Sequence, residues 1–425
     1  MSSAFEIRLQ RELTRLRQAH LYRSRRVVEG AHGVLLEVDG KACINFCSND
    51  YLGLAADPRV AEAARAALSR GGTGSGAAAL VSGYNREHAQ LEEELADFVQ
   101  RPRALLFSTG WAANLGVLRG LLTRDDVLVA DELNHASLID GGRLSGAHYR
   151  RVAHAQLPAF EAALSAPAGI DAYGRSGHKY VVSDSVFSMD GDCADLPALA
   201  RLSRRADATL MVDDAHGFGV LGPDGRGSVI AAGLSVDDLP IYVATLGKSL
   251  GAAGAFVAGS EALIEFLIQR ARSWVFSTAP PPAISAAARA ALRIVRDEPE
   301  RRQRLFENIE QLRSGAAARG IALGLDGSLA TTPTPILPLI LGDEARAVAL
   351  SRHLFERGFW VAAIRPPTVP VGTARLRITL SSAHTPQQIE ALLDAIADGI
   401  KTLTPSDSIA SVPAAASIEA SIAHA

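Results

Sequence analysis

Residues 241–259 read IYVATLGKSLGAAGAFVAG, and this stretch carries the pattern that decides the fold. Its two apolar runs, 241–247 and 254–259, predict buried strands. Between them lies a glycine-rich segment with one lysine, Lys248. Glycines leave space for a flat or bulky group near the backbone, and a buried lysine is costly unless it is neutralised or its amine takes part in chemistry. The stretch therefore predicts a ligand site at the end of a core strand.

Strand-like and helix-like segments alternate on both sides of this stretch. Helical periodicity covers residues 57–70 and 85–99. Further strand-like runs occupy 103–108, 126–131, 179–186 and 209–215. This alternation is typical of an α/β fold with a mostly parallel sheet.

The pattern changes after the three prolines at 280–282, where helical stretches (283–297, 300–319, 344–358, 386–400) are interleaved with strand-like runs at 335–341, 359–364 and 375–380. These features predict a smaller C-terminal α+β domain. At the other end, an arginine-rich helix over residues 1–24 precedes a short β segment with a hairpin turn at Asp39-Gly40. The expected organisation is an N-terminal helix and β segment (1–48), a large domain (49–285), a small domain (286–400) and a flexible tail (401–425).

Composition excludes several classes of protein. The chain has 425 residues and a net charge of -3, so nothing indicates a nucleic-acid or membrane partner. No apolar run reaches membrane-spanning length. Three cysteines, Cys43, Cys47 and Cys193, give neither a disulfide framework nor a zinc set. We expect a cytoplasmic protein with no metal site.

Two glycine motifs resemble nucleotide-binding signatures but do not fit them. GFGVLG at 217–222 matches G-x-G-x-x-G, yet Pro223, Gly225 and Gly227 follow where a helix must begin. GKS at 247–249 resembles the end of a P-loop, but Tyr242 occupies the position that requires glycine.

Polar side chains gather instead at the carboxyl ends of the predicted strands, where ligands bind in open α/β sheets. They are Ser108, Thr109, His135, Ser188, Asp190, Asp213, Asp214, His216, Thr245 and Lys248, and Gly110 and Trp111 follow Thr109 at a strand end that opens into a helix. A lysine for a Schiff base, a carboxylate for a pyridine nitrogen, imidazoles, hydroxyls and a helix N-terminus for a phosphate are what pyridoxal phosphate requires. Taken alone, each residue also has a structural interpretation, such as a helix cap or an exposed lysine.

The motifs in their order resemble one known family. They are FCSNDYLGLA (46–55), GTGSG (72–76), LVSGYNREHAQLE (80–92), FSTGWAAN (107–114), NHASLIDG (134–141), SVFSMDGD (185–192), MVDDAHGFGVLG (211–222), GRGS (225–228) and TLGKSLG (245–251). Over residues 20–400 the chain resembles the α-oxoamine synthases. This resemblance implies the aspartate-aminotransferase-like fold (PLP fold type I) and pyridoxal 5'-phosphate as cofactor.

The resemblance also implies roles for single residues. Lys248 resembles the Schiff-base lysine, Asp213 the partner of the pyridine nitrogen, and His135 the ring-stacking residue, which also contacts substrate. The remaining cofactor-binding positions are Gly110, Trp111, Ser188, His216 and Thr245, with Ser277 and Thr278 reaching the phosphate from the other subunit of a homodimer. Arg377 resembles the arginine that binds the amino-acid carboxylate, and Asn49 and Thr368 match substrate contacts.

Two segments depart from the family pattern. Relatives place an arginine near the N-terminus for the acyl substrate. LYRSRR (21–26) offers Arg23, Arg25 and Arg26 there, and Tyr22 competes for the position; we assign Arg23. Residues 77–80 are Ala-Ala-Ala-Leu, where relatives often carry glycine, serine and histidine.

The stretch AIRPPTVPVGTARLRITLSSAH (363–384) resembles the family member of biotin biosynthesis. That resemblance implies decarboxylative condensation of L-alanine with a pimeloyl thioester, carried on coenzyme A or on an acyl carrier protein. Two alternatives remain open: another α-oxoamine synthase, such as a glycine C-acetyltransferase, and a non-catalytic relative that binds the cofactor.

Overall fold

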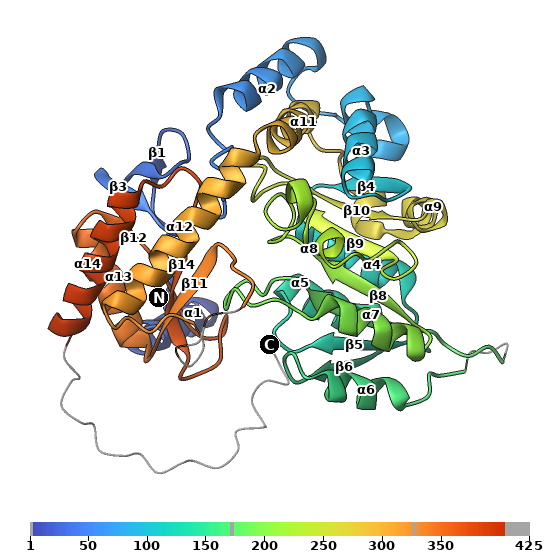
Figure 1. The fold of residues 1–425 in the computed structure, drawn as a ribbon. Helices are drawn as coiled ribbons and strands as arrows, with labels where there is room; N and C mark the ends of the chain where they lie inside the picture. The colour runs from blue at the N-terminus through green and yellow to red at the C-terminus, as the bar shows by residue number, and fades with distance from the viewer. Residues whose placement is uncertain (1–2, 171–173, 325–326, 328, 330, 404–425) are drawn as a thin grey trace.

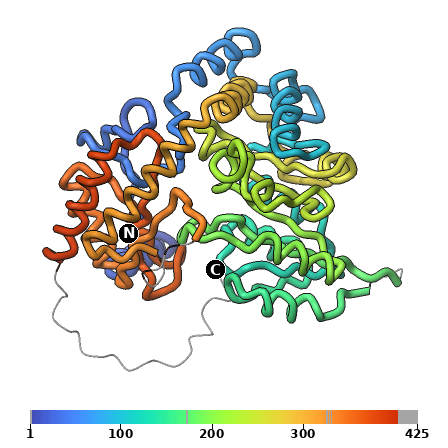
Figure 2. Tube along the Cα trace, in the orientation of Figure 1, coloured from blue at the N-terminus to red at the C-terminus, as the bar shows by residue number. Residues whose placement is uncertain are grey.

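A computed structural model describes residues 3–170, 174–324, 327, 329 and 331–403. These residues form a large α/β domain and a smaller region that combines the N- and C-terminal parts of the chain (Figure 1). The backbone trace in Figure 2 shows the same two regions side by side, joined by the long run of helices near residue 300. Most of the expected tail, residues 404–425, lies outside the described residues.

A seven-stranded sheet forms the centre of the large domain, in the order β4-β10-β9-β8-β7-β5-β6. β10 runs antiparallel to both neighbours, whereas the pairs from β9 to β6 are parallel. The strands are β4 (Arg103–Phe107), β5 (Val127–Asp131), β6 (His148–Val152), β7 (Lys179–Asp184), β8 (Ala208–Asp213), β9 (Ile241–Thr245) and β10 (Ala255–Gly259).

Both faces of this sheet are buried, which explains its nearly continuous apolar runs. Successive residues point to opposite faces: Leu210 and Val212 pack into one core cluster, and Met211 between them packs into the other. One face is covered by α4 (Gly110–Leu121), α5 (Ala136–Ser145) and α9 (Glu261–Arg270). The other is covered by α3 (Arg86–Phe98), α6 (Leu157–Ser165), α7 (Leu196–Arg205), α8 (Ser228–Ala231) and α11 (Pro282–Asp297).

Two helices begin at the carboxyl edge of this sheet because side chains cap them there. The Thr109 hydroxyl accepts a hydrogen bond from the backbone N–H of Ala112 (3.0 Å), which starts α4. His135 is the N-cap of α5, and its ring accepts from the backbone N–H of Ser137 (3.3 Å). These caps place Gly110 and His135 at the edge where the strands end.

The smaller region contains two sheets. β11 (Ile336–Gly342), β14 (Ala374–Thr379) and β13 (Ala362–Ile364) form an antiparallel sheet beside α12 (Pro299–Ala318), α13 (Glu344–Glu356) and α14 (Pro386–Thr402). β1 (Val28–Glu29), β2 (Leu35–Val38) and β3 (Lys41–Asn45) form a second sheet with β12 (Phe359–Trp360), which pairs in parallel with β3. The N-terminal β segment is therefore joined to the C-terminal region through backbone hydrogen bonds.

The remaining elements are α1 (Ala4–Gln18), α2 (Pro58–Gly71), α10 (Arg272–Val275), a π-helix at Ala79–Gly83 and a 3-10 turn at Pro223–Gly225. The first helix is shorter than the predicted 1–24, since it ends at Gln18 and His20 has a left-handed backbone (φ 54). The expected fold class is confirmed: a mostly parallel sheet with a smaller α+β region. Among the described helices, none is both long and apolar enough to cross a membrane.

Candidate active site

A cavity of about 190 Å³ opens at the carboxyl ends of β7, β8 and β9. The predicted residues that line it are Gly110, Trp111, His135, Ser188, Asp213, His216, Thr245 and Lys248. Asn114, Ser137, Asp184, Ala215, Val243 and Ala244 complete the lining. One chain therefore brings together eight residues that the sequence predicted as a cofactor site.

Lys248 lies in the loop after β9, and its Nζ is 2.8 Å from Nε2 of His216. Burial lowers the pKa of Lys248 to about 8, although the carboxylates of Asp213 and Asp184 act in the opposite direction. Burial, the positive charge of Lys248 and that of Arg377 hold the pKa of His216 well below its usual range. The site therefore contains a neutral imidazole beside an amine that loses its proton near physiological pH.

A chain of hydrogen bonds leads from His216 to Arg377. His216 Nδ1 is 2.6 Å from the hydroxyl of Tyr51, which donates to Oδ1 of Asn49 (3.1 Å). Nη1 of Arg377 donates to the same oxygen (3.1 Å). The Tyr51 hydroxyl has one hydrogen, which it donates to Asn49. Its oxygen is therefore left to accept from Nδ1–H of His216, and Nε2 of His216 accepts from Lys248. The chain fixes the tautomer of His216.

Asp213 ends β8 and is 6% exposed. Nδ2 of Asn114 donates to its Oδ2 (2.7 Å), and the backbone N–H of Ala215 donates to its Oδ1 (3.0 Å). The adjacent Asp214 points elsewhere, since it accepts from Ser185 and other residues inside the protein. Only the first carboxylate of the pair lines the cavity.

His135 also lines the cavity. Its backbone N–H donates to Oδ2 of Asp184 (2.6 Å), and its Nδ1 is 2.7 Å from the hydroxyl of Ser137. The ring meets Trp111 edge to face, with centroids 6.3 Å apart. Burial, together with the charge of Asp213, raises the pKa of Asp184 well above its ordinary value.

The donor set fits pyridoxal phosphate. A partly deprotonated amine, a buried carboxylate and imidazoles face one cavity that also contains the N-terminus of α4. At Gly110 a Cβ would meet no atom within 4 Å, so there is open space beside the first N–H groups of this helix. A helix N-terminus with such space suits a phosphate.

Ser277 and Thr278 do not line the Lys248 cavity. They border a separate small cavity with Tyr84, His88 and Glu92. Ser277 donates to the carbonyl of Ser273 (2.7 Å). Within one chain these two predicted phosphate contacts are therefore apart from the other cofactor residues.

The predicted substrate residues form two groups. Arg377, in β14, is 6% exposed, donates from Nε to the carbonyl of Ser188 (2.5 Å) and contacts Asn49 as described. Arg23 donates to the hydroxyl of Thr368 (3.2 Å) at the surface of the smaller region. Neither Asn49 nor Arg377 lines the cavity, but their hydrogen-bond chain leads into it.

Sequence reasoning missed Tyr51, Asn114 and Asp184. Tyr51 and Asn114 fall within motifs that were recognised, but both lie among residues that read as core. Asp184 ends β7 directly before the predicted loop, so its position at a strand end was an available signal.

Comparisons with known proteins show what the chain as a whole is similar to. Residues 41–396 match the family described as aminotransferase class I and II. The chain is 55% identical to the 8-amino-7-oxononanoate synthase of Methylococcus capsulatus, with 91% of this chain and 97% of the relative covered. It is 50% identical to the Saccharophagus degradans enzyme of the same name, with 94% and 98% covered.

Solved structures are similar over nearly the whole chain. Serine palmitoyltransferase from S. paucimobilis, determined with bound PLP and myriocin, has a TM-score of 0.86 at 28% identity and covers 94% of this chain and 99% of its own. The 8-amino-7-oxononanoate synthase of Francisella tularensis has a TM-score of 0.71 at 34% identity, with 85% and 98% covered.

Proposed function

The chain belongs to the aminotransferase class I and II family, and from this membership we propose how its residues carry out the 8-amino-7-oxononanoate synthase reaction. It has this activity of biotin biosynthesis and uses pyridoxal phosphate. The substrates we propose are L-alanine and a pimeloyl thioester, which yield 8-amino-7-oxononanoate, carbon dioxide and the free thiol carrier. The observation that carries the proposal is that Lys248 and the buried carboxylate of Asp213 line the same cavity.

Bound pyridoxal phosphate supplies an electron sink for negative charge that develops on the Cα of the amino acid. Lys248 is the residue we propose to hold the cofactor covalently and, as a neutral amine, to move the Cα proton. Its pKa of about 8 gives it a substantial neutral fraction near neutral pH. The neutral His216 accepts from Lys248 Nζ and thereby orients the amine.

Asp213 is the residue we propose to hold the pyridine nitrogen in its protonated form. Asn114 and the backbone of Ala215 hold both oxygens of Asp213 by hydrogen bonds, so the carboxylate group does not have to reorient. His135, held through its backbone by Asp184, is proposed to stack on the cofactor ring. Gly110, Trp111, Ser188 and Thr245 are proposed to complete the cofactor contacts.

Arg377 is proposed to bind the carboxylate of alanine, with Asn49 beside it. A guanidinium presents a fork of donors that matches a carboxylate in two parallel hydrogen bonds. The contacts to Ser188 and Asn49 fix its orientation before substrate arrives. Arg23 and Thr368, which touch each other, are proposed to contact the acyl substrate.

A homodimer belongs to the same proposal. Ser277 and Thr278 lie outside the Lys248 cavity of their own chain. We propose that they contact the phosphate in the cavity of a second subunit. We retain as proposals the division into 1–48, 49–285 and 286–400, and a cytoplasmic location, which the three free cysteines favour.

The test is product formation by the purified protein. L-alanine with pimeloyl-CoA, and separately with a pimeloyl-loaded carrier protein, should yield 8-amino-7-oxononanoate by mass spectrometry. Glycine with acetyl-CoA is the matched alternative, and a larger kcat/KM for that pair would refute the proposed substrates. Sedimentation equilibrium tests the dimer, and a monomer with full activity would contradict it.

A further inference from the structure

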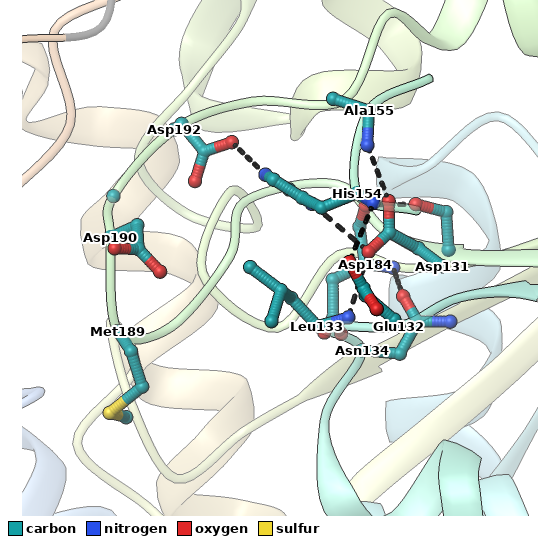
Figure 3. A network of polar contacts seen from close by, with 12 residues as sticks. Asp131, Glu132, Leu133, Asn134, His154, Ala155, Asp184, Met189, Asp190 and Asp192 are labelled. Atoms are coloured by element: carbon teal, nitrogen blue, oxygen red, sulfur yellow. Dashed lines mark hydrogen bonds and ion pairs between the residues drawn. The ribbon is translucent and has the colours of Figure 1, made fainter. Parts of the chain in front are cut away.

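His154 lies outside the cavity and forms a bridge between two carboxylates (Figure 3). It follows β6, and its Nδ1 is 3.0 Å from Oδ1 of Asp131 while its Nε2 is 2.9 Å from Oδ2 of Asp192. The ring also meets Phe187 edge to face, with centroids 4.4 Å apart. Both ring nitrogens are thus engaged with acceptors, which requires a proton on each.

Asp131 connects this bridge to the turn that carries His135. It ends β5 and is 1% exposed. Its oxygens accept from the backbone N–H groups of Leu133 (2.8 Å) and Ala155 (2.9 Å). Two residues after Leu133 comes His135 at the cavity wall. The bridge therefore begins at the base of the His135 turn.

Asp192 connects the bridge to the loop that carries Ser188. Within this loop, defined as residues 185–193, the backbone N–H of Phe187 donates to the carbonyl of Asp192 (2.9 Å), and that of Gly191 donates to the carbonyl of Phe187 (2.8 Å). The loop is a compact turn, and these backbone hydrogen bonds link Asp192 to Phe187, the residue directly before Ser188.

The smaller region holds the opposite side of the same loop. Arg377 donates to the Ser188 carbonyl (2.5 Å), Thr334 donates to the Gly191 carbonyl (2.7 Å), and Arg375 forms a buried ion pair with Asp190. The 185–193 loop is thus held by polar contacts with β14 on one side and with His154 on the other.

We propose that His154 is a positioning residue for alanine binding. It fixes the 185–193 loop relative to the turn that carries His135, and this loop contains the Ser188 carbonyl that accepts from Arg377. This inference rests on the proposed role of Arg377 as the carboxylate-binding residue. His154 touches no reacting atom and acts through Asp192 and Asp131.

The charges around His154 support this role. The carboxylates of Asp131 and Asp192 raise the pKa of His154 to about 10, against the effect of burial. Glu132 accepts from the backbone N–H of His154 (3.2 Å). Asp190 in the same loop is paired with Arg375, and Asp184 accepts from His135. The protonated imidazole is therefore the cation that joins the two carboxylates, and a neutral side chain would leave them unpaired.

The experiment compares His154→Gln with the matched control His178→Gln. His178 also has an edge-to-face aromatic partner, Tyr180, and a hydrogen bond to Thr209 (2.8 Å), but it precedes the opposite end of β7. We expect H154Q to raise the KM for alanine about ten- to hundredfold, with much less change in the KM for pimeloyl-CoA. H178Q should change neither constant by more than about twofold.

A second readout does not depend on activity. In cofactor-free protein, hydrogen exchange of the amides of Phe187 and Gly191 should accelerate at least about tenfold in H154Q and remain unchanged in H178Q. Asp192→Asn keeps an acceptor for Nε2 and is the milder variant, with a smaller effect in the same direction. In the double variant H154Q/D192N, which removes one of the two unpaired carboxylates and leaves Asp131, the KM for alanine should partly recover.

Unchanged exchange in H154Q, or equal increases in both KM values, would overturn the inference. If H154Q does not fold, D192N decides: no effect on exchange and none on the KM for alanine would likewise overturn it. Failure of the unaltered enzyme to use alanine would refute the proposed function instead, while the exchange experiment would still report on the bridge.

Discussion

We expect Lys248 to lose its proton at an unusually low pH for a lysine. With a pKa of about 8, roughly a tenth of the amine is neutral at pH 7 and about half at pH 8. An ordinary lysine with a pKa near 10.4 is neutral in only about 0.04% of molecules at pH 7. The cavity therefore increases the reactive amine roughly 250-fold at neutral pH.

Competitive acylation of cofactor-free protein with acetic anhydride measures this fraction, because only a neutral amine reacts. Peptide mass spectrometry follows the Lys248 site from pH 6 to pH 11, with exposed Lys401 as the reference for the reagent. We expect a midpoint near pH 8 that falls in Asp213→Asn, since this carboxylate raises the pKa of Lys248. A midpoint above pH 10, or an increase in the midpoint in D213N, would refute the reasoning.

Four further outcomes are expected. Arg377→Lys, which loses the forked donor set, should raise the KM for alanine at least about tenfold; an unchanged KM would contradict the carboxylate role. Asn114→Leu removes a 2.7 Å hydrogen bond to the Asp213 carboxylate and should lower kcat at least about tenfold, whereas full activity would exclude this support. Arg375→Met leaves its buried aspartate partner unpaired and should cost about 3–5 kcal/mol of unfolding free energy in urea; no loss would mean the pair is dispensable. The pKa of His154 in the folded protein, about 10, exceeds its ordinary value of 6.5, so its contribution to the free energy of unfolding is complete below about pH 6.5 and is lost as the pH rises through 10. The difference in unfolding free energy between the parent and H154Q should narrow over that range. A constant difference would contradict this.

Strand ends explain why much of the candidate site could be predicted from the sequence. Lys248, Asp213 and His135 each follow an apolar run that becomes a strand of the central sheet, and the carboxyl ends of parallel strands meet at one edge. The fold class could be predicted because strand-like and helix-like segments alternate along the chain. The bounds of the first helix were less accurate because its charged pattern continues past Gln18, where the helix ends.

Other features depend on tertiary contacts that no local pattern encodes. Asn114 lies inside α4 and reads as a core position, yet the crossing of α4 over the sheet brings its amide to Asp213. Tyr51 approaches His216 from a segment 165 residues away. β6, with the sequence HYRRV, lacks the apolar pattern of a buried strand because it is the edge of the sheet. The bridge formed by His154 could not be predicted, since its two carboxylate partners become neighbours only in the folded chain.

The reaction proposed for this chain depends most directly on which lysine bonds to the cofactor. Holoenzyme reduced with sodium borohydride and digested for peptide mass spectrometry should carry the pyridoxyl group on Lys248 alone. A pyridoxyl group on another lysine, or no modified lysine in protein that retains activity, would contradict the account.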